Sequence, residues 1–99
     1  MTHRVAVTAR AQRQILRALS WWAKNRDKAP EALEDDWVEA LALIASAPHV
    51  GKFSSRQRRG IVRRVALERS RYYLFYRINP TGDIDILQLW HASRRPPKR

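Results

Sequence analysis

Residues 71–78 read RYYLFYRI and shape the architecture more than any other segment of the chain. Their density of aromatic and branched side chains is typical of a β-strand. The turn-forming segment Asn79–Asp83 (NPTGD) follows, and Ile84–Trp90 (IDILQLW) then returns as a second strand. Upstream, Ile61–Leu67 (IVRRVAL) predicts a third strand. Because the connections are short, we expect these three strands to form an antiparallel meander.

Side-chain alternation assigns the faces of these strands. In the strand over residues 61–67, Ile61, Val65 and Leu67 share one face and Arg64 lies on the other. Arg63 does not fit this pattern, because alternation places it on the apolar face. In the last strand, strict alternation places on one face Ile84, Ile86, Gln88 and Trp90, and on the other Asp85, Leu87 and Leu89. Both faces of the last strand are rather apolar, which indicates a central position in the sheet.

Upstream of the meander the period changes to that of helices. Arg4–Thr8 predicts a short strand, and Thr8 can cap a helix over about 9–27. A second helix is expected from Pro30 until Pro48 ends it. The predicted buried stripes are Ile15, Leu16, Leu19, Trp22 and Ala23 in the first helix, and Leu33, Trp37, Leu41 and Ile44, widened by Val38 and Ala45, in the second.

The predicted fold class is α+β: an N-terminal strand, an antiparallel helical hairpin, then the three-stranded meander. This makes a four-stranded, largely antiparallel sheet with both helices on one face. Lys52–Gly60 (KFSSRQRRG) is expected to be a polar, basic loop. A chain of 99 residues supports one domain, which we place at residues 1–92, followed by a basic, flexible tail over residues 93–99.

The charge is strongly positive and unevenly distributed. The net charge is +11, and residues 52–99 carry thirteen Lys/Arg against three acidic residues. Residues 1–51 are nearly balanced, with seven basic and six acidic residues. A charge gathered in one half attracts polyanions or an acidic partner protein. We expect the arginines to collect on the sheet face opposite the helices and on the loop at 52–60.

Several classes of protein and site are disfavoured by composition. The chain has no cysteine, which excludes disulfides and thiolate metal sites and fits a reducing cytoplasm. Its three histidines lie in separate segments and its three glycines do not cluster, so neither a metal site nor a phosphate loop is predicted. With no long apolar window or signal peptide, we expect a cytoplasmic protein without a cofactor or membrane contact.

Five segments occur in an order that resembles the RelE/ParE superfamily of toxins over nearly the whole chain. They are NRDKAPEAL at Asn25–Leu33, APHVG at Ala47–Gly51, RRVAL at Arg63–Leu67, YYLFYRI at Tyr72–Ile78 and IDILQLWHASR at Ile84–Arg94. The resemblance implies a toxin of a type II toxin–antitoxin system, of the kind linked to plasmid stabilisation. It also implies a cognate antitoxin that neutralises the toxin and through which the complex reaches operator DNA.

The superfamily divides by target, and the sequence carries features of both branches. RelE-like members are ribosome-dependent mRNA endoribonucleases, or mRNA interferases, whereas ParE-like members inhibit DNA gyrase and growth. If the chain is a nuclease, the resemblance implies that His91 is the acid or base, and that Arg64 and Arg94 hold the phosphate. Tyr73 or Tyr76 is then the tyrosine expected to stack or to donate a proton.

Two departures favour the ParE-like branch. Tyr73 stands where nuclease members carry an arginine, and no tyrosine follows Tyr76. The ending His91-x-x-Arg94 is similar to that of ParE-like members. A third class, a basic nucleic-acid-binding module without toxicity, would share the charge but lack an apolar groove for a partner.

Two groups of residues are predicted to bind partners. Cations for a nucleic acid or another target are Lys52, Arg56, Arg58, Arg59, Arg64, Arg69, Arg94 and Arg95. Trp21 lies off the buried stripe of its helix, and with Arg17 it is predicted to contact the antitoxin. The structural alternative for Trp21 is a residue covered by tight packing of the helical hairpin.

Overall fold

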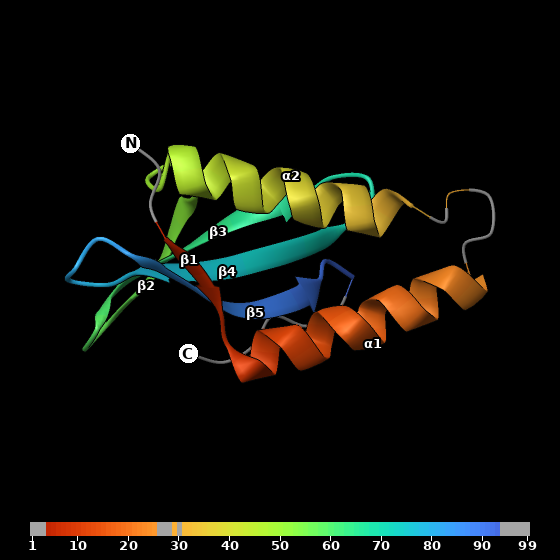
Figure 1. Cartoon of the computed structure of the whole chain (residues 1–99), viewed down its shortest axis with the longest axis horizontal. Coiled ribbons are helices and arrows are strands. Elements are labelled where there is room, and N and C mark those ends of the chain that lie inside the picture. The colour runs from red at the N-terminus through yellow and green to blue at the C-terminus, as the bar shows by residue number, and fades with distance from the viewer. Residues whose placement is uncertain (1–3, 26–28, 30, 94–99) are drawn as a thin grey trace.

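The computed structural model describes residues 4–25, 29 and 31–93. The elements in chain order are β1 (Val5–Val7), α1 (Ala9–Asn25), α2 (Ala32–Ser46), β2 (Lys52–Gln57), β3 (Gly60–Leu67), β4 (Tyr72–Ile78) and β5 (Ile84–His91). They build a five-stranded sheet in the order β1-β5-β4-β3-β2, with the two helices packed against it (Figure 1). Strands β2 to β5 pair antiparallel, and β1 pairs parallel with β5. The predicted α+β class and the central position of the last strand are confirmed.

The segment expected to be a basic loop is instead the edge strand β2 and its turn. β2 pairs with β3 from Lys52↔Arg64 to Gln57↔Gly60, so the sheet has five strands rather than four. Its side chains give no period-2 signal because an edge strand is held by backbone hydrogen bonds along one side and buries little. Gly60 closes the hairpin with a φ of +137°, a conformation that favours glycine.

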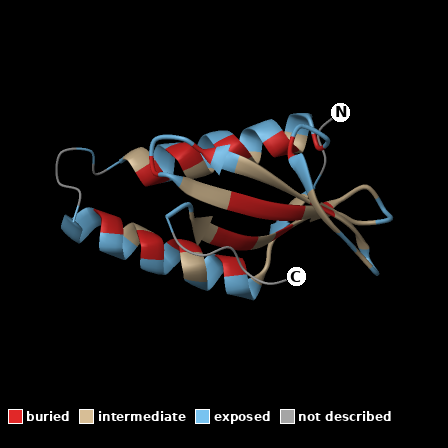
Figure 2. Cartoon of the chain, turned by 180° about the vertical axis from the view of Figure 1, so that it is seen from behind, coloured by how far each residue is buried: buried red, intermediate tan, exposed pale blue. Residues whose placement is uncertain are grey.

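One hydrophobic core joins both helices to the sheet, and Figure 2 shows the buried stretches of the helices and of β4 and β5. Its buried members are Ala11, Ile15, Ala18 and Trp22 from α1, Leu33, Ala40 and Ile44 from α2, and Leu67, Leu74, Tyr76, Ile84, Ile86 and Leu89 from the sheet. Trp37 and Leu41 pack against this core as partly buried residues. The helices therefore cover one face of the sheet, as predicted.

Three positions of the predicted helical stripes are wrong. Leu16 and Val38 are each 59% exposed, and Ala23 is also exposed. In α1 the buried stripe runs through residues 11, 15, 18 and 22. Leu16 lies one residue past Ile15 and so is turned by about 100° around the helix, away from the sheet.

A β-bulge in β5 reverses the predicted faces of its second half. Phe75 pairs with Gln88, but the next residue, Tyr76, pairs with Ile86, which leaves Leu87 as the extra residue. Leu89 therefore joins the core with Ile84 and Ile86, and His91 follows on the helix side. Gln88 and Trp90 lie on the opposite face, where strict alternation would place Leu89.

Tyr76 ties the segment before β2 to the centre of the sheet. Its buried hydroxyl donates to the Pro48 carbonyl at 2.7 Å and accepts the Gly51 N–H at 2.9 Å. The Arg63 guanidinium donates to the Gly51 carbonyl at 2.9 Å. Arg63, the residue that does not fit the apolar face of β3, points to the helix side as alternation predicts. There its guanidinium is satisfied by the Gly51 carbonyl. The arginines of β3 are thus divided between the two faces, rather than gathered on the open one.

Asp36 of α2 holds the turn between β3 and β4. Its carboxylate accepts the backbone N–H and the hydroxyl of Ser70, both at 2.8 Å. Asp36 is 6% exposed and Ser70 is fully buried, so these hydrogen bonds replace the water that hydrates both groups in the unfolded chain. The sequence gives no sign of this anchor, because an acidic residue in the first turns of a helix is explained by the helix dipole alone.

The N-terminal strand, β1, is held by the last strand, β5. β1 pairs with β5 from Val5↔Ile84 to Val7↔Ile86, and the Ile84 N–H donates to the Arg4 carbonyl at 2.8 Å. The Thr8 hydroxyl accepts the Ala11 N–H at 3.3 Å, as expected of an N-cap, and donates to the Ile86 carbonyl at 2.8 Å. The start of α1 is therefore fixed by β5.

Candidate functional site: an aromatic groove and a basic hairpin

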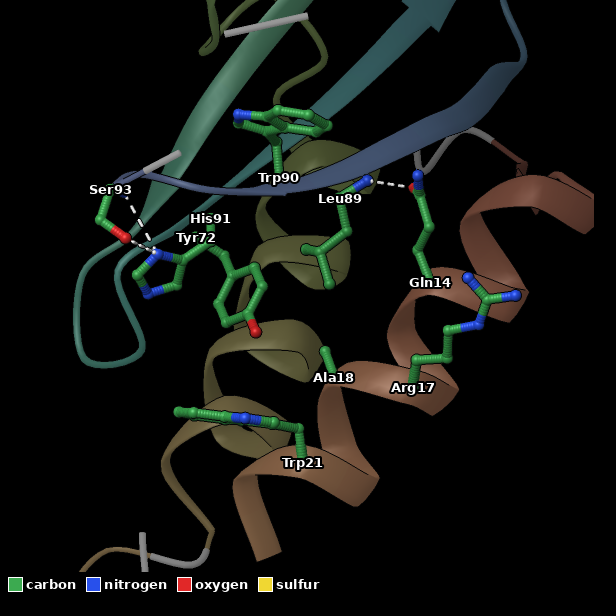
Figure 3. Close-up of a pocket in the computed structure, with 9 residues that line it drawn as sticks. All are labelled: Gln14, Arg17, Ala18, Trp21, Tyr72, Leu89, Trp90, His91 and Ser93. Atoms are coloured by element: carbon green, nitrogen blue, oxygen red, sulfur yellow. Dashed lines mark hydrogen bonds between the residues drawn. The ribbon is translucent and has the colours of Figure 1, made fainter. Parts of the chain in front are cut away.

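A groove of about 700 Å³ lies between α1 and the end of β5. We call it the aromatic groove, and its lining residues are Gln14, Arg17, Ala18, Trp21, Tyr72, Leu89, Trp90, His91 and Ser93 (Figure 3). The α1 residues follow helical spacing i, i+3, i+4 and i+7, which places them on one face of the helix. Trp21 and Arg17, the residues predicted to meet the antitoxin, both line this groove.

Trp21 is 46% exposed, which the tight-packing interpretation does not predict. In Figure 3 its indole lies below Tyr72 and Ala18 on the α1 side of the groove, whereas the Trp90 indole points to the other side of β5. The side-chain Oε1 of Gln14 accepts the Leu89 N–H at 2.8 Å, so α1 satisfies a backbone donor of β5 beyond its pairing with β1. The groove therefore combines apolar rings with a fixed polar seam.

His91 lies at the end of β5, on the helix side. Its Nδ1 is 2.6 Å from the Ser93 hydroxyl and accepts the Ser93 N–H at 3.2 Å. Its ring meets the Tyr72 ring edge to face, with centroids 4.9 Å apart. The bulge at Leu87 is what brings His91 to this face, since unbroken alternation would turn it away from α1.

The residues of the predicted nuclease set are not brought together. Tyr73 pairs with Trp90, on the face opposite His91, and the Arg64 guanidinium lies 5.2 Å from the centroid of the Tyr73 ring. Arg64 and Tyr73 thus form a pair on the open face, while His91 faces α1. Arg94 lies outside the described residues. Among the residues that the structure describes, no single surface carries His91, Arg64 and Tyr73.

Four arginines of the β2–β3 hairpin line one groove. A second groove, of about 470 Å³, is lined by His49, Arg56, Gln57, Arg58, Arg59, Gly60, Ile61, Arg63, Ile78, Asn79 and Pro80, and we call it the hairpin groove. Arg58 and Arg59 form the turn between β2 and β3. Lys52 pairs across the strands with Arg64 and does not line this groove. Arg95 lies outside the described residues.

Arg69 belongs to neither groove. It bridges Asp36 at 2.9 Å and Glu39 at 3.0 Å in the turn after β3. Hydrogen bonds to Glu39 and then Asp36 raise the pKa of Arg69. Its charge is therefore engaged with α2, and its geometry does not support the predicted role in target binding.

Within residues 4–25, 29 and 31–93, no cluster of three or more histidine, cysteine or carboxylate side chains could hold a metal ion. No helix in that part of the chain is long and apolar enough to cross a membrane. The grooves offer aromatic rings, cations and hydrogen-bonding groups, which suit recognition of a macromolecule. Sequence reasoning missed Gln14 and Ser93, although the seven-residue spacing of Gln14 and Trp21 places both on one helical face.

The aligned structures of other proteins share this fold. The toxin–antitoxin complex described as "Chromosomal ParDE TA system from P. aeruginosa" superposes with a TM-score of 0.72 at 20% identity, covering 93% of this chain and 98% of the other. The RelE–RelB complex from Pyrococcus horikoshii OT3 superposes with a TM-score of 0.67 at 21% identity, covering 96% and 100%. Isolated E. coli RelE gives 0.54 at 19% identity, covering 94% and 87%.

At these identities the structural likeness establishes the fold alone, and the family follows from the sequence. No curated protein sequence matches the chain. Residues 5–96 match the family described as the ParE toxin of the type II toxin–antitoxin system parDE. That match spans nearly the whole chain, and it confirms the resemblance inferred from the five ordered segments. The chain belongs to the ParE toxin family, within the RelE/ParE superfamily.

Proposed function

We propose that this toxin inhibits DNA gyrase and is held inactive by a cognate antitoxin. The observation that carries the choice of target is the division of the predicted nuclease residues between two faces of the sheet. A metal-independent nuclease needs its base, acid and phosphate-binding cation around one reacting phosphodiester. His91 and the Arg64–Tyr73 pair are separated by the sheet itself. Membership of the ParE family favours the same branch.

The target is tested by expressing the toxin briefly and following DNA, RNA and protein synthesis separately. We expect broken DNA and an induced damage response, while messages stay intact. Purified toxin should also inhibit plasmid supercoiling by purified gyrase. Immediate translation arrest with cut mRNA, together with unaffected supercoiling, would overturn the proposal in favour of a RelE-like nuclease. In that case His91→Gln should abolish the cleavage and leave the fold intact.

For the antitoxin, we propose that the aromatic groove receives an apolar side chain of its toxin-binding segment. A large, exposed ring beside a cation is the usual composition of an interface hot spot, and Trp21 and Arg17 provide it. The P. aeruginosa and P. horikoshii structures both contain a toxin of this fold with its antitoxin. An acidic segment would complement the positive charge of this chain.

Trp21→Ala is expected to weaken antitoxin binding by about 2 kcal/mol, or roughly thirtyfold in Kd. The measurement is titration calorimetry with the purified antitoxin. Leu16→Ala is the matched control, because Leu16 is an exposed apolar residue of the same helix that does not line the groove. If the Trp21 variant and the wild-type toxin bind the antitoxin with equal affinity, the groove is not part of the antitoxin interface.

A further inference from the structure

Positive charge is concentrated at the tip of the β2–β3 hairpin, in a groove that no carboxylate lines. None of the residues that line the hairpin groove is acidic, whereas four of them are arginines: Arg56, Arg58, Arg59 and Arg63. The ion pairs among the described residues engage Arg69 and Arg77 instead. The charge of the groove is therefore not neutralised within the described part of the fold and is available to an external anion.

The fold presents this charge outward. In Figure 1 the β2–β3 hairpin and the turn between β4 and β5 project from the same end of the sheet, beyond the helices. Arg56, Arg58 and Arg59 are exposed, and Arg63, which is half-buried, also lines the groove. The Arg63 Nε is buried and has no hydrogen-bond partner among the described residues, although the same guanidinium donates to Gly51 through its NH1.

The composition of the groove distinguishes between kinds of polyanion. Proteins that bind single-stranded nucleic acids stack bases on aromatic rings beside their cations. No phenylalanine, tyrosine or tryptophan lines the hairpin groove. The Tyr73 ring lies beneath Arg64 on the open face of the sheet, away from the hairpin groove. His49 is the one aromatic ring among the lining residues, against four arginines, so the groove offers mainly cations. Such a composition suits the phosphate backbone of a duplex, whose bases stay stacked on one another.

We infer that the hairpin groove is a phosphate-binding site for duplex DNA, separate from the aromatic groove and additional to the proposed gyrase inhibition. The exposed arginines contact phosphates along the backbone, and binding depends on charge rather than on base sequence. The toxin can then associate with DNA independently of any protein target. The site predicts weak, salt-sensitive affinity that is the same for unrelated sequences of equal length.

The test is fluorescence anisotropy of a labelled 20-base-pair duplex with the full-length toxin, repeated over a range of salt concentrations. We expect Arg56→Ala/Arg58→Ala/Arg59→Ala to weaken binding by about tenfold or more near 0.1 M salt. The slope of log K against log salt should become shallower by about 0.9 for each phosphate that the variant no longer neutralises. Arg63 is left unchanged because its bond to Gly51 supports the fold.

The matched control removes the same charge elsewhere. Arg4→Ala/Arg10→Ala/Arg13→Ala removes three exposed arginines that do not line the groove, and it should retain nearly wild-type affinity and slope. An equal decrease in affinity for the two triple variants would overturn the inference, because attraction to the net charge would then explain the binding. Tighter binding of single-stranded RNA of the same length, or displacement of the duplex by an equimolar glutamate-rich peptide, would also overturn it.

Discussion

Tyr76 is a single side chain on which the segment between α2 and β2 depends. It is fully buried, and its hydroxyl is both donor and acceptor, to Pro48 and Gly51. Tyr76→Phe leaves a buried N–H and a buried carbonyl without this partner. We expect a decrease of about 1–3 kcal/mol in the free energy of unfolding, measured by urea denaturation. Tyr73→Phe, on the open face, should change it by less than about 0.5 kcal/mol.

The same hydroxyl predicts a dependence of stability on alkaline pH. Burial raises the pKa of Tyr76 above its ordinary value of 10.0, although the Gly51 hydrogen bond and the Arg63 charge oppose the shift. The folded state therefore holds this proton more tightly than the unfolded state does. The contribution is full below the ordinary pKa and is lost as pH rises through the folded pKa. The decrease in stability above about pH 10 should be smaller in Tyr76→Phe than in wild type.

Asp36 fixes the β3–β4 turn from the side of α2. Replacing it with alanine leaves the buried Ser70 N–H and hydroxyl without the carboxylate that accepts them. We expect Asp36→Ala to lower the free energy of unfolding by about 1–3 kcal/mol. Asp35→Ala removes an exposed carboxylate one residue away and serves as control. A similar small effect in both variants would show that the turn does not need this anchor.

Among the elements, the β2–β3 hairpin depends on the backbone of Gly60. A Cβ at this position would lie 2.6 Å from the Ile78 carbonyl oxygen, and the φ of +137° is rarely adopted by other residues. Gly60→Ala should destabilise the fold by about 1–3 kcal/mol. Hydrogen exchange should show that the reduced protection is concentrated in β2 and the neighbouring part of β3. A uniform reduction across the sheet would contradict this local origin.

The elements also show what the sequence can predict. Strands β3, β4 and β5 are recognisable because buried strands carry an apolar period or an apolar run. β2 escapes recognition because no residue of Lys52–Gln57 is buried, and its pairing comes from backbone groups that every sequence shares. The bulge at Leu87 does leave a mark in the sequence, because the polar residues Asp85 and Gln88 are three positions apart and the alternation breaks between Ile86 and Leu87. Strict alternation carried through this break puts Gln88, Leu89 and Trp90 on the wrong faces.

That bulge limits prediction of the candidate site as well. Trp21 and Arg17, which are predicted from the sequence as one partner-binding pair, do line the same groove, because they are four residues apart in one helix. Their proximity to His91 and Tyr72 requires the true face of β5, which depends on its register with β4. The ion pairs of Arg69 could not be predicted, because its partners, Asp36 and Glu39, lie about thirty residues earlier in the chain and meet it only after folding.

For the molecule as a whole, a net charge of +11 works against compactness. Added salt screens this repulsion, so the melting temperature should rise between about 0.05 M and 0.3 M NaCl. Arg56→Ala/Arg58→Ala/Arg59→Ala carries three fewer charges and should show a smaller rise, measured by thermal denaturation. A falling melting temperature with salt would mean that ion pairs such as Arg69–Asp36 outweigh the repulsion.

The parallel pairing of β1 with β5 bears on biosynthesis. Among the described residues, β1 has no other strand partner, and the Thr8 cap of α1 rests on the Ile86 carbonyl. A nascent chain must therefore wait for residues 84–91 before its first strand can join the sheet. The described part of the fold is completed only after β5 has been synthesised, so both helices are made before β1 has its strand partner.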